Sequence, residues 1–168
     1  MLHKKASMFP AAMVLFSFLG VPLASAQAPV CPFTNASLQG NFAIVGTYGA
    51  NVALALATRH YDGLGNLPGA YIVNGPTAGS TTGARTISTG TQAGTYTVNC
   101  DGTGKINRVL TQSNGSTTNQ VDDFIITAAV PTFNGLMIAT AIVDATEVPS
   151  TIVPGGVFVF RTQTRLPD

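Results

Sequence analysis

A few ionisable residues could carry chemistry in this chain. His60 is the only histidine after residue 26, and Asp62 follows it two positions later. A histidine beside a carboxylate can act as a general base or hold a metal ion, because its side chain titrates near neutral pH. Both residues flank a predicted tight turn, and no Gly-x-Ser-x-Gly nucleophile motif accompanies them. The sequence therefore predicts no catalytic residue, no cofactor and no metal site.

Three more polar residues interrupt apolar segments of predicted strands: Arg108, Asp122 and Arg161. If the strands close into a barrel, inward and outward positions alternate, and inward polar groups, together with His60, could orient a small ligand. The alternative, which we favour here, is that Arg108, Asp122 and Arg161 face water, since Arg and Asp are rarely buried unless paired.

Two Asp-Gly-x-Gly segments punctuate the chain, at residues 62–65 and 101–104. Asp-Gly favours a tight reversal between strands, because glycine accepts the positive φ that such turns need. A calcium loop would require further carboxylates at alternate positions, which neither segment has. We therefore predict that Asp62 and Asp101 cap their own turns through backbone N–H groups.

The first 26 residues resemble a secretory signal peptide. Lys4 and Lys5 form a basic start, residues 8–23 are mostly apolar, and Ala24-Ser25-Ala26 matches the Ala-x-Ala cleavage pattern. A membrane anchor is the weaker alternative, because the apolar run is short and contains two prolines. We expect cleavage after Ala26, a secreted or periplasmic protein, and no transmembrane span once the signal is removed. Residues 27–37 are then an irregular lead-in to a single domain over residues 38–168.

Charge and cysteine content narrow the function classes further. After residue 26 the chain has six basic and seven acidic residues, a net charge of −1, with no cluster of cations. Nucleic acid is therefore a poor partner. The two cysteines, Cys31 and Cys100, are an even number in a chain predicted to be exported, which predicts a disulfide between them.

Alternating segments separated by turn residues predict an all-β fold. Strands are expected over residues 38–48, 52–61, 67–73, 95–100, 105–112, 118–130, 136–144 and 156–165, with a loop over most of residues 77–94 and a short strand at 85–88. Eight or nine strands joined by short reversals favour an antiparallel up-and-down meander. Pairing the first strand with the last would close it into a barrel and remove both exposed edges.

The strand and turn motifs resemble those of exported bacterial proteins of unknown role. The resemblance rests on Leu38-Gln39-Gly40-Asn41-Phe42, on Tyr61-Asp62-Gly63-Leu64-Gly65-Asn66, on Gly94-Thr95-Tyr96-Thr97-Val98 and on Cys100-Asp101-Gly102-Thr103-Gly104. In shape the group is similar to the calycin-like barrels, which include lipocalins, avidins and allene oxide cyclase. The motifs specify shape and transfer no functional residue.

Three functions remain open at this point. The first is a non-enzymatic exported barrel that binds a small apolar ligand or a surface partner. The second is a cyclase or isomerase type of enzyme with a cavity reached by His60, Arg108 or Asp122. The third is a structural or adhesive surface module, which predicts an apolar or edge surface.

Overall fold

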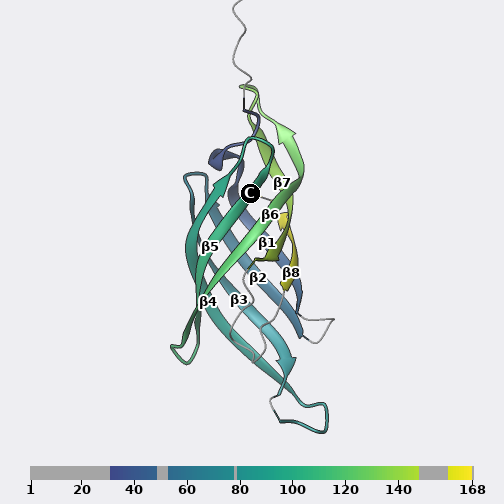
Figure 1. Cartoon of the computed structure of the whole chain (residues 1–168). Helices are drawn as coiled ribbons and strands as arrows, with labels where there is room; N and C mark the ends of the chain where they lie inside the picture. The colour runs from purple at the N-terminus through teal and green to yellow at the C-terminus, as the bar shows by residue number, and fades with distance from the viewer. Residues whose placement is uncertain (1–30, 49–52, 78, 148–158, 168) are drawn as a thin grey trace, which may run out of the picture.

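The computed structural model describes residues 31–48, 53–77, 79–147 and 159–167, and these form an antiparallel β-barrel (Figure 1). The predicted signal peptide over residues 1–26 and the proline-containing linker at 149–154 lie outside the described residues. The elements are a 3₁₀ turn η1 (Asn35–Ser37) and the strands β1 (Gln39–Tyr48), β2 (Ala53–Asp62), β3 (Asn66–Pro76), β4 (Arg85–Val98), β5 (Thr103–Gln112), β6 (Thr117–Pro131), β7 (Met137–Thr146) and β8 (Val159–Arg165).

Each strand pairs with its neighbours in the chain, and β1 pairs antiparallel with β8 to close the barrel. The closing register runs from Phe42 opposite Arg165 to Tyr48 opposite Val159. The predicted meander and its closure are therefore confirmed, with eight strands. Closure leaves no unpaired edge along the joined strands, which removes a site of edge-to-edge aggregation. No helix among the described residues is long and apolar enough to cross a membrane.

The short strand predicted at 85–88 is present but longer than expected, and the loop predicted for the rest of residues 77–94 is wrong from residue 89 onward. Strand β4 begins at Arg85 and pairs with β3 from Pro76 opposite Arg85 to Asn66 opposite Thr95. From Gly90 onward it also pairs with β5. Gly90 and Gly94 lower the strand propensity of this segment, but two hydrogen-bonded partner strands override that local preference.

An apolar cluster fills the end of the barrel that carries η1. Its members are Leu38, Phe42, Tyr61, Leu67, Tyr96, Ile106, Phe124, Ala139 and Ile142. The Tyr61 ring packs edge-on against the rings of Phe42 and Tyr96, with centroid separations of 5.3 and 5.0 Å. The Tyr96 hydroxyl donates to the carbonyl oxygen of Leu38 at 2.8 Å, which fixes the lead-in over the cluster. This cluster supplies the hydrophobic part of the core.

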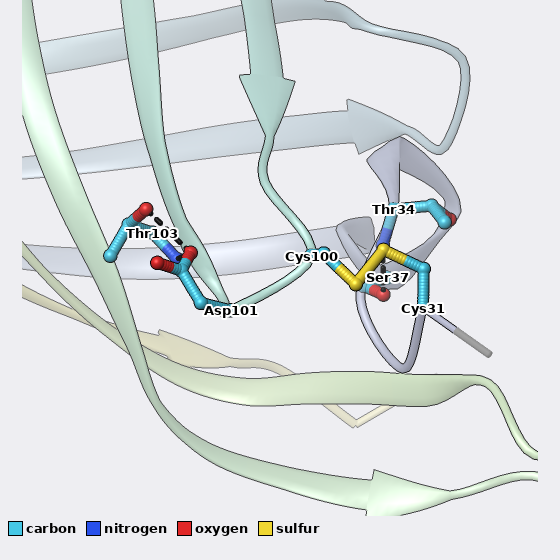
Figure 2. The surroundings of a disulfide bond; sticks show 6 residues. All are labelled: Cys31, Thr34, Ser37, Cys100, Asp101 and Thr103. Carbon is cyan, nitrogen blue, oxygen red and sulfur yellow. Dashed lines mark hydrogen bonds between the residues drawn. A yellow bond between two sulfur atoms is a disulfide. The ribbon is translucent and has the colours of Figure 1, made fainter. Parts of the chain in front are cut away.

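The disulfide predicted between Cys31 and Cys100 is present (Figure 2). It joins the segment before η1 to the turn between β4 and β5, as the yellow bond in Figure 2 shows. The Asn35 side chain also accepts a hydrogen bond from the backbone N–H of Val98 at 2.8 Å. Residues 31–37 of the lead-in are thus held against the barrel by a covalent bond and by hydrogen bonds.

Inward-facing glycines make room for large neighbours inside the barrel. A Cβ atom on Gly104 would overlap the Phe124 ring and the Thr97 carbonyl oxygen. One on Gly46 would lie 2.6 Å from Cγ of Arg161. These glycines therefore let bulky side chains cross the interior, which the alternation of small and large residues in a small barrel requires.

Replacing Gly104 with alanine should lower the free energy of unfolding by about 1–3 kcal/mol, the usual cost of overpacking a core. The cause is the overlap with the Phe124 ring and with backbone that cannot move freely. Gly75→Ala is the matched control, because its Cβ would meet only the Ala53 side chain, at 3.6 Å. Urea unfolding of both variants measures the difference, and similar midpoints would contradict this steric account.

Candidate functional site

Below the apolar cluster, the barrel interior is lined by polar side chains that are almost fully buried. They are Arg59, Gln92, Arg108, Gln120, Asp122, Asp144, Thr146, Arg161 and Gln163, all at most 6% exposed. They come from β2 and from β4 to β8. Our favoured interpretation that Arg108, Asp122 and Arg161 face water is therefore wrong. All three point inward, and each finds an oppositely charged partner there.

Asp122 lies between two arginines from different strands. Its Oδ2 accepts from Nε of Arg108 at 2.8 Å, and its Oδ1 lies 2.6 Å from a terminal nitrogen of Arg161. Burial raises the pKa of this carboxyl, but the charges of Arg161 and Arg108 and their hydrogen bonds lower it overall. Asp122 is therefore ionised at neutral pH and joins β5, β6 and β8 across the interior.

A second buried carboxylate, Asp144 on β7, repeats this arrangement. Nε of Arg161 donates to Asp144 Oδ1 at 2.5 Å, and the Gln163 amide donates to Asp144 Oδ2. Arg59 is more distant, with its closest terminal nitrogen 3.9 Å from Asp144 Oδ2. Arg161 thus bridges both carboxylates, whereas Arg59 has only a long ion pair.

Neutral groups complete the connections. Gln92 Oε1 accepts from Arg59 at 3.1 Å and from Arg108 at 2.8 Å. The Tyr61 hydroxyl accepts from Arg59 at 2.9 Å and donates to Gln163 at 3.0 Å. Following these contacts returns to the starting residue. We call this closed set of side chains the polar ring: Arg59, Gln92, Arg108, Asp122, Arg161, Asp144, Gln163 and Tyr61.

His60 does not belong to the polar ring. It is exposed on the outer side of β2, where its Nδ1 lies 3.1 Å from Oδ1 of Asn41. Alternation along β2 places Arg59 and Tyr61 inside and His60 outside. The structure therefore brings together Arg108, Asp122 and Arg161 among the predicted ligand-binding residues, and separates His60 from them by the barrel wall.

The chemistry available to the polar ring is binding and charge compensation. Its acidic groups are held by arginines, and burial raises the pKa of Tyr61 even though Arg59 acts against that rise. Among the described residues, no group of three or more His, Cys, Asp or Glu side chains could hold a metal ion. The ring thus presents fixed guanidinium and amide groups inside the barrel.

Sequence reasoning missed Arg59, Asp144 and the three buried glutamines. A signal for Arg59 was present, since it occupies the same alternating face of β2 as Ala53, Ala55 and Tyr61. Alternation alone did not say which face of β2 turns inward. The exposed face carries Leu54 and Leu56, and the small alanines face the interior, where the large polar side chains of other strands need space.

Asp62 and Asp101 cap their own turns, as predicted. Asp62 Oδ1 accepts from the backbone N–H groups of Leu64, Gly65 and Asn66, at 2.7 to 2.9 Å. Asp101 accepts from the N–H of Thr103 at 3.0 Å and from its hydroxyl at 2.7 Å (Figure 2). Their oxygens are used within the turns, which explains the repeated Asp-Gly-x-Gly motif without a bound ion.

The carboxyl of Asp62 should titrate with a pKa of about 2, lowered from 3.8 first by the Asn66 side chain and then by backbone N–H groups. Because the folded-state pKa is depressed, this contribution to stability is complete above the unfolded pKa and is lost as the pH falls toward 2. NMR titration of the carboxyl carbon measures it. Asn66→Ala should return the pKa toward 3.8, and an unchanged pKa in that variant would contradict the assignment.

Outside the barrel, large apolar side chains gather on one wall. Val45 pairs with Leu56 and Leu56 with Ile72, which forms one row across β1, β2 and β3. In the next row, Thr47 pairs with both Leu54 and Phe160. We call this wall the outer apolar face, defined by Val45, Leu54, Leu56, Ile72, Ile87 and Phe160, which are 48–64% exposed. Ile87 extends the second row, because its partner Asn74 pairs with Leu54.

The opposite wall has a different character. There Lys105 on β5 forms ion pairs with Asp123 and with Glu147, and all three are exposed or half-exposed. On β5 and β6 the exposed apolar residues Val109, Ile125 and Val130 do not pair with one another. Val109 faces Asn119, and Ile125 faces Thr103 and the half-buried Val143. The outer apolar face is therefore specific to the β8 and β1–β4 side.

Comparison with known proteins assigns neither a family nor a function to this chain. No protein-family model, curated protein sequence or solved structure matches this chain. The closed eight-stranded antiparallel barrel has a shape consistent with the calycin-like barrels.

Proposed function

We propose that this protein is an exported, non-enzymatic binding barrel that presents its outer apolar face to a partner. The supporting observation is that six large apolar side chains stay about half exposed in two adjacent rows on one wall. Contiguous exposed apolar patches on soluble domains commonly mark interaction sites, because covering them removes apolar surface from water. Export is supported by the Cys31–Cys100 disulfide, since such bonds persist in oxidising compartments.

A surface partner is better supported than a small apolar ligand inside the barrel. The polar ring lines the barrel interior with charged and amide groups that already bond to one another. An apolar ligand there would separate these groups from their partners without offering hydrogen bonds in return. A partner that binds to the outer apolar face breaks none of these hydrogen bonds.

The chemistry of the outer apolar face favours a neutral, apolar partner surface. The outward positions between its members are filled by Thr47, Asn74 and Thr162, and none of these is charged. Arg85, which donates to Oδ1 of Asn74 at 3.0 Å, lies at the edge of this face. A cationic partner group would lose hydration on this wall and gain no opposite charge. A structural or adhesive module would use the same wall, so that hypothesis differs only in what the partner is.

No specific observation favours the cyclase or isomerase alternative. It predicts a cavity reached by His60, Arg108 or Asp122, and His60 lies on the outer side of the barrel wall. Arg108 and Asp122 are paired with each other at 2.8 Å.

Site-specific photo-cross-linking tests the proposal in cells that export the protein. A benzophenone amino acid placed at Leu56 should give a discrete higher-mass adduct, because this position lies within the outer apolar face. The same probe at Ile125, which is similarly exposed on the opposite wall, is the control. An adduct of twice the mass identifies a second copy as the partner. No adduct at position 56, or equal adducts at both positions, would refute the proposal.

Two double variants test whether cross-linking depends on the outer apolar face. With the probe at Phe160, Leu54→Ser combined with Leu56→Ser should reduce adduct yield about tenfold or more, because two buried contacts are lost. Val109→Ser combined with Ile125→Ser changes the opposite wall and should leave the yield unchanged. Equal loss in both pairs would contradict a specific face.

A further inference from the structure

We propose that the barrel interior binds a small monovalent anion beside Arg59, a property independent of the outer apolar face. Of the described charged residues, five are buried inside: Arg59, Arg108, Arg161, Asp122 and Asp144. Three guanidinium groups face two carboxylates, so the buried set carries one surplus positive charge. The polar ring is therefore not neutral by itself.

This surplus cannot be removed by losing a proton. A buried lysine can become neutral, but the arginine side chain remains protonated in proteins. A buried charge without a compensating partner is costly, because it gives up its hydration. A bound anion would supply the missing negative charge at the place where it is needed.

The contacts place the surplus charge at Arg59. Asp122 is shared by Arg108 and Arg161, and Arg161 also contacts Asp144 at 2.5 Å. Arg59 is 1% exposed, and its nearest carboxylate oxygen is 3.9 Å away. Its terminal nitrogens donate to the neutral oxygens of Tyr61 and Gln92, and its Nε finds no acceptor among the described residues. The Nε–H edge of Arg59 is thus the donor to the anion.

The electrostatic environment of Arg108 is consistent with one surplus positive charge in the barrel interior. Burial lowers the pKa of Arg108 to about 10, and the charges of Arg161 and Arg59 contribute in the same direction. The deep burial of Arg59 restricts the ligand to a small anion, such as a halide or a single carboxylate group.

Thermal unfolding of the mature protein in sodium chloride and in sodium gluconate at equal ionic strength tests the proposal. Gluconate is too large for a site at a buried side chain, and equal ionic strength cancels general screening. Chloride should raise Tm, by about 3–5 °C for each tenfold increase above its Kd. Equal Tm values in the two salts at all concentrations would overturn the proposal.

Arg59→Met removes the surplus charge while keeping similar bulk. The Tyr61 hydroxyl and Gln92 Oε1 retain other partners in Gln163 and Arg108, so the variant should fold. It should show no chloride dependence of Tm and should match or exceed the wild type in gluconate. Arg85→Met, at an exposed arginine, should retain the wild-type dependence. A chloride dependence that survives in Arg59→Met would refute the assignment to Arg59.

Anomalous diffraction from crystals of the wild-type protein grown with sodium bromide provides the direct readout. The expected result is a bromide peak in contact with Nε of Arg59. Bromide peaks confined to surface positions, that is an adventitious ion only, would overturn the proposal even if chloride raised Tm.

Discussion

Replacing Asp122 with asparagine should lower the free energy of unfolding by about 3–5 kcal/mol, the range found when one member of a buried ion pair is removed. Asp122 is fully buried, and its two oxygens serve Arg108 and Arg161. The variant would raise the buried surplus from one positive charge to two. It would also direct an amide N–H₂ group toward guanidinium donors, where no hydrogen bond can form.

The adjacent residue offers a matched control. Asp123 has the same chemistry but is exposed, and its ion pair with Lys105 spans 3.3 Å at the surface. Asp123→Asn should change the free energy of unfolding by less than about 1 kcal/mol. Urea unfolding followed by circular dichroism at neutral pH measures both. If the two variants lose similar amounts of unfolding free energy, the buried ion pairs of Asp122 stabilise the fold no more than the surface ion pair of Asp123.

The effect of Asp122→Asn should also depend on pH in a defined direction. The folded-state pKa of Asp122 is depressed below 3.8, so the stabilisation by its charge is complete above that value and is lost as the pH falls through the folded-state pKa. The stability difference between the wild type and Asp122→Asn should therefore be constant near neutral pH and shrink below about pH 4.

Removing the disulfide should have an effect of similar size. Cys31 and Cys100 are 69 residues apart, and closing a loop of that length restricts the unfolded chain by about 4 kcal/mol in the loop-entropy model. The double variant Cys31→Ser and Cys100→Ser should lose about 2–5 kcal/mol of unfolding free energy. Urea unfolding of the oxidised wild type and the double variant measures the loss.

Reduction of the wild type provides the control for the disulfide. A reducing agent should bring the wild-type unfolding midpoint close to that of the double variant and should leave the double variant unchanged. The lead-in should stay attached in both, because the N–H of Met137 donates to the Pro32 carbonyl oxygen at 3.0 Å and Asn35 accepts from Val98. An unfolding midpoint insensitive to reduction would show that the crosslink does not limit the unfolded chain.

Local sequence signals determined much of this architecture. The Asp-Gly-x-Gly turns specify where the chain reverses, because Gly63 and Gly102 adopt positive φ values of 77° and 84° and the preceding aspartates cap the turn. Alternation predicted the strands, and hairpins in succession predicted a meander that closes. The two cysteines predicted their disulfide. Each of these signals involves a few neighbouring residues or one covalent pairing. It can therefore be recognised in the amino-acid sequence without knowledge of which distant strands are in contact.

The tertiary structure alone decided which face of each strand turns inward. A period of two is the same whichever face is buried, and β2 buries Ala53, Ala55, Arg59 and Tyr61 while exposing Leu54 and Leu56. The choice depends on charge and volume supplied from distant strands, since Arg108 and Arg161 become buried only where Asp122 meets them. The strand predicted at 85–88 extends through Gly94 for a similar reason, because β3 supplies hydrogen-bonding partners to residues whose composition predicted a loop.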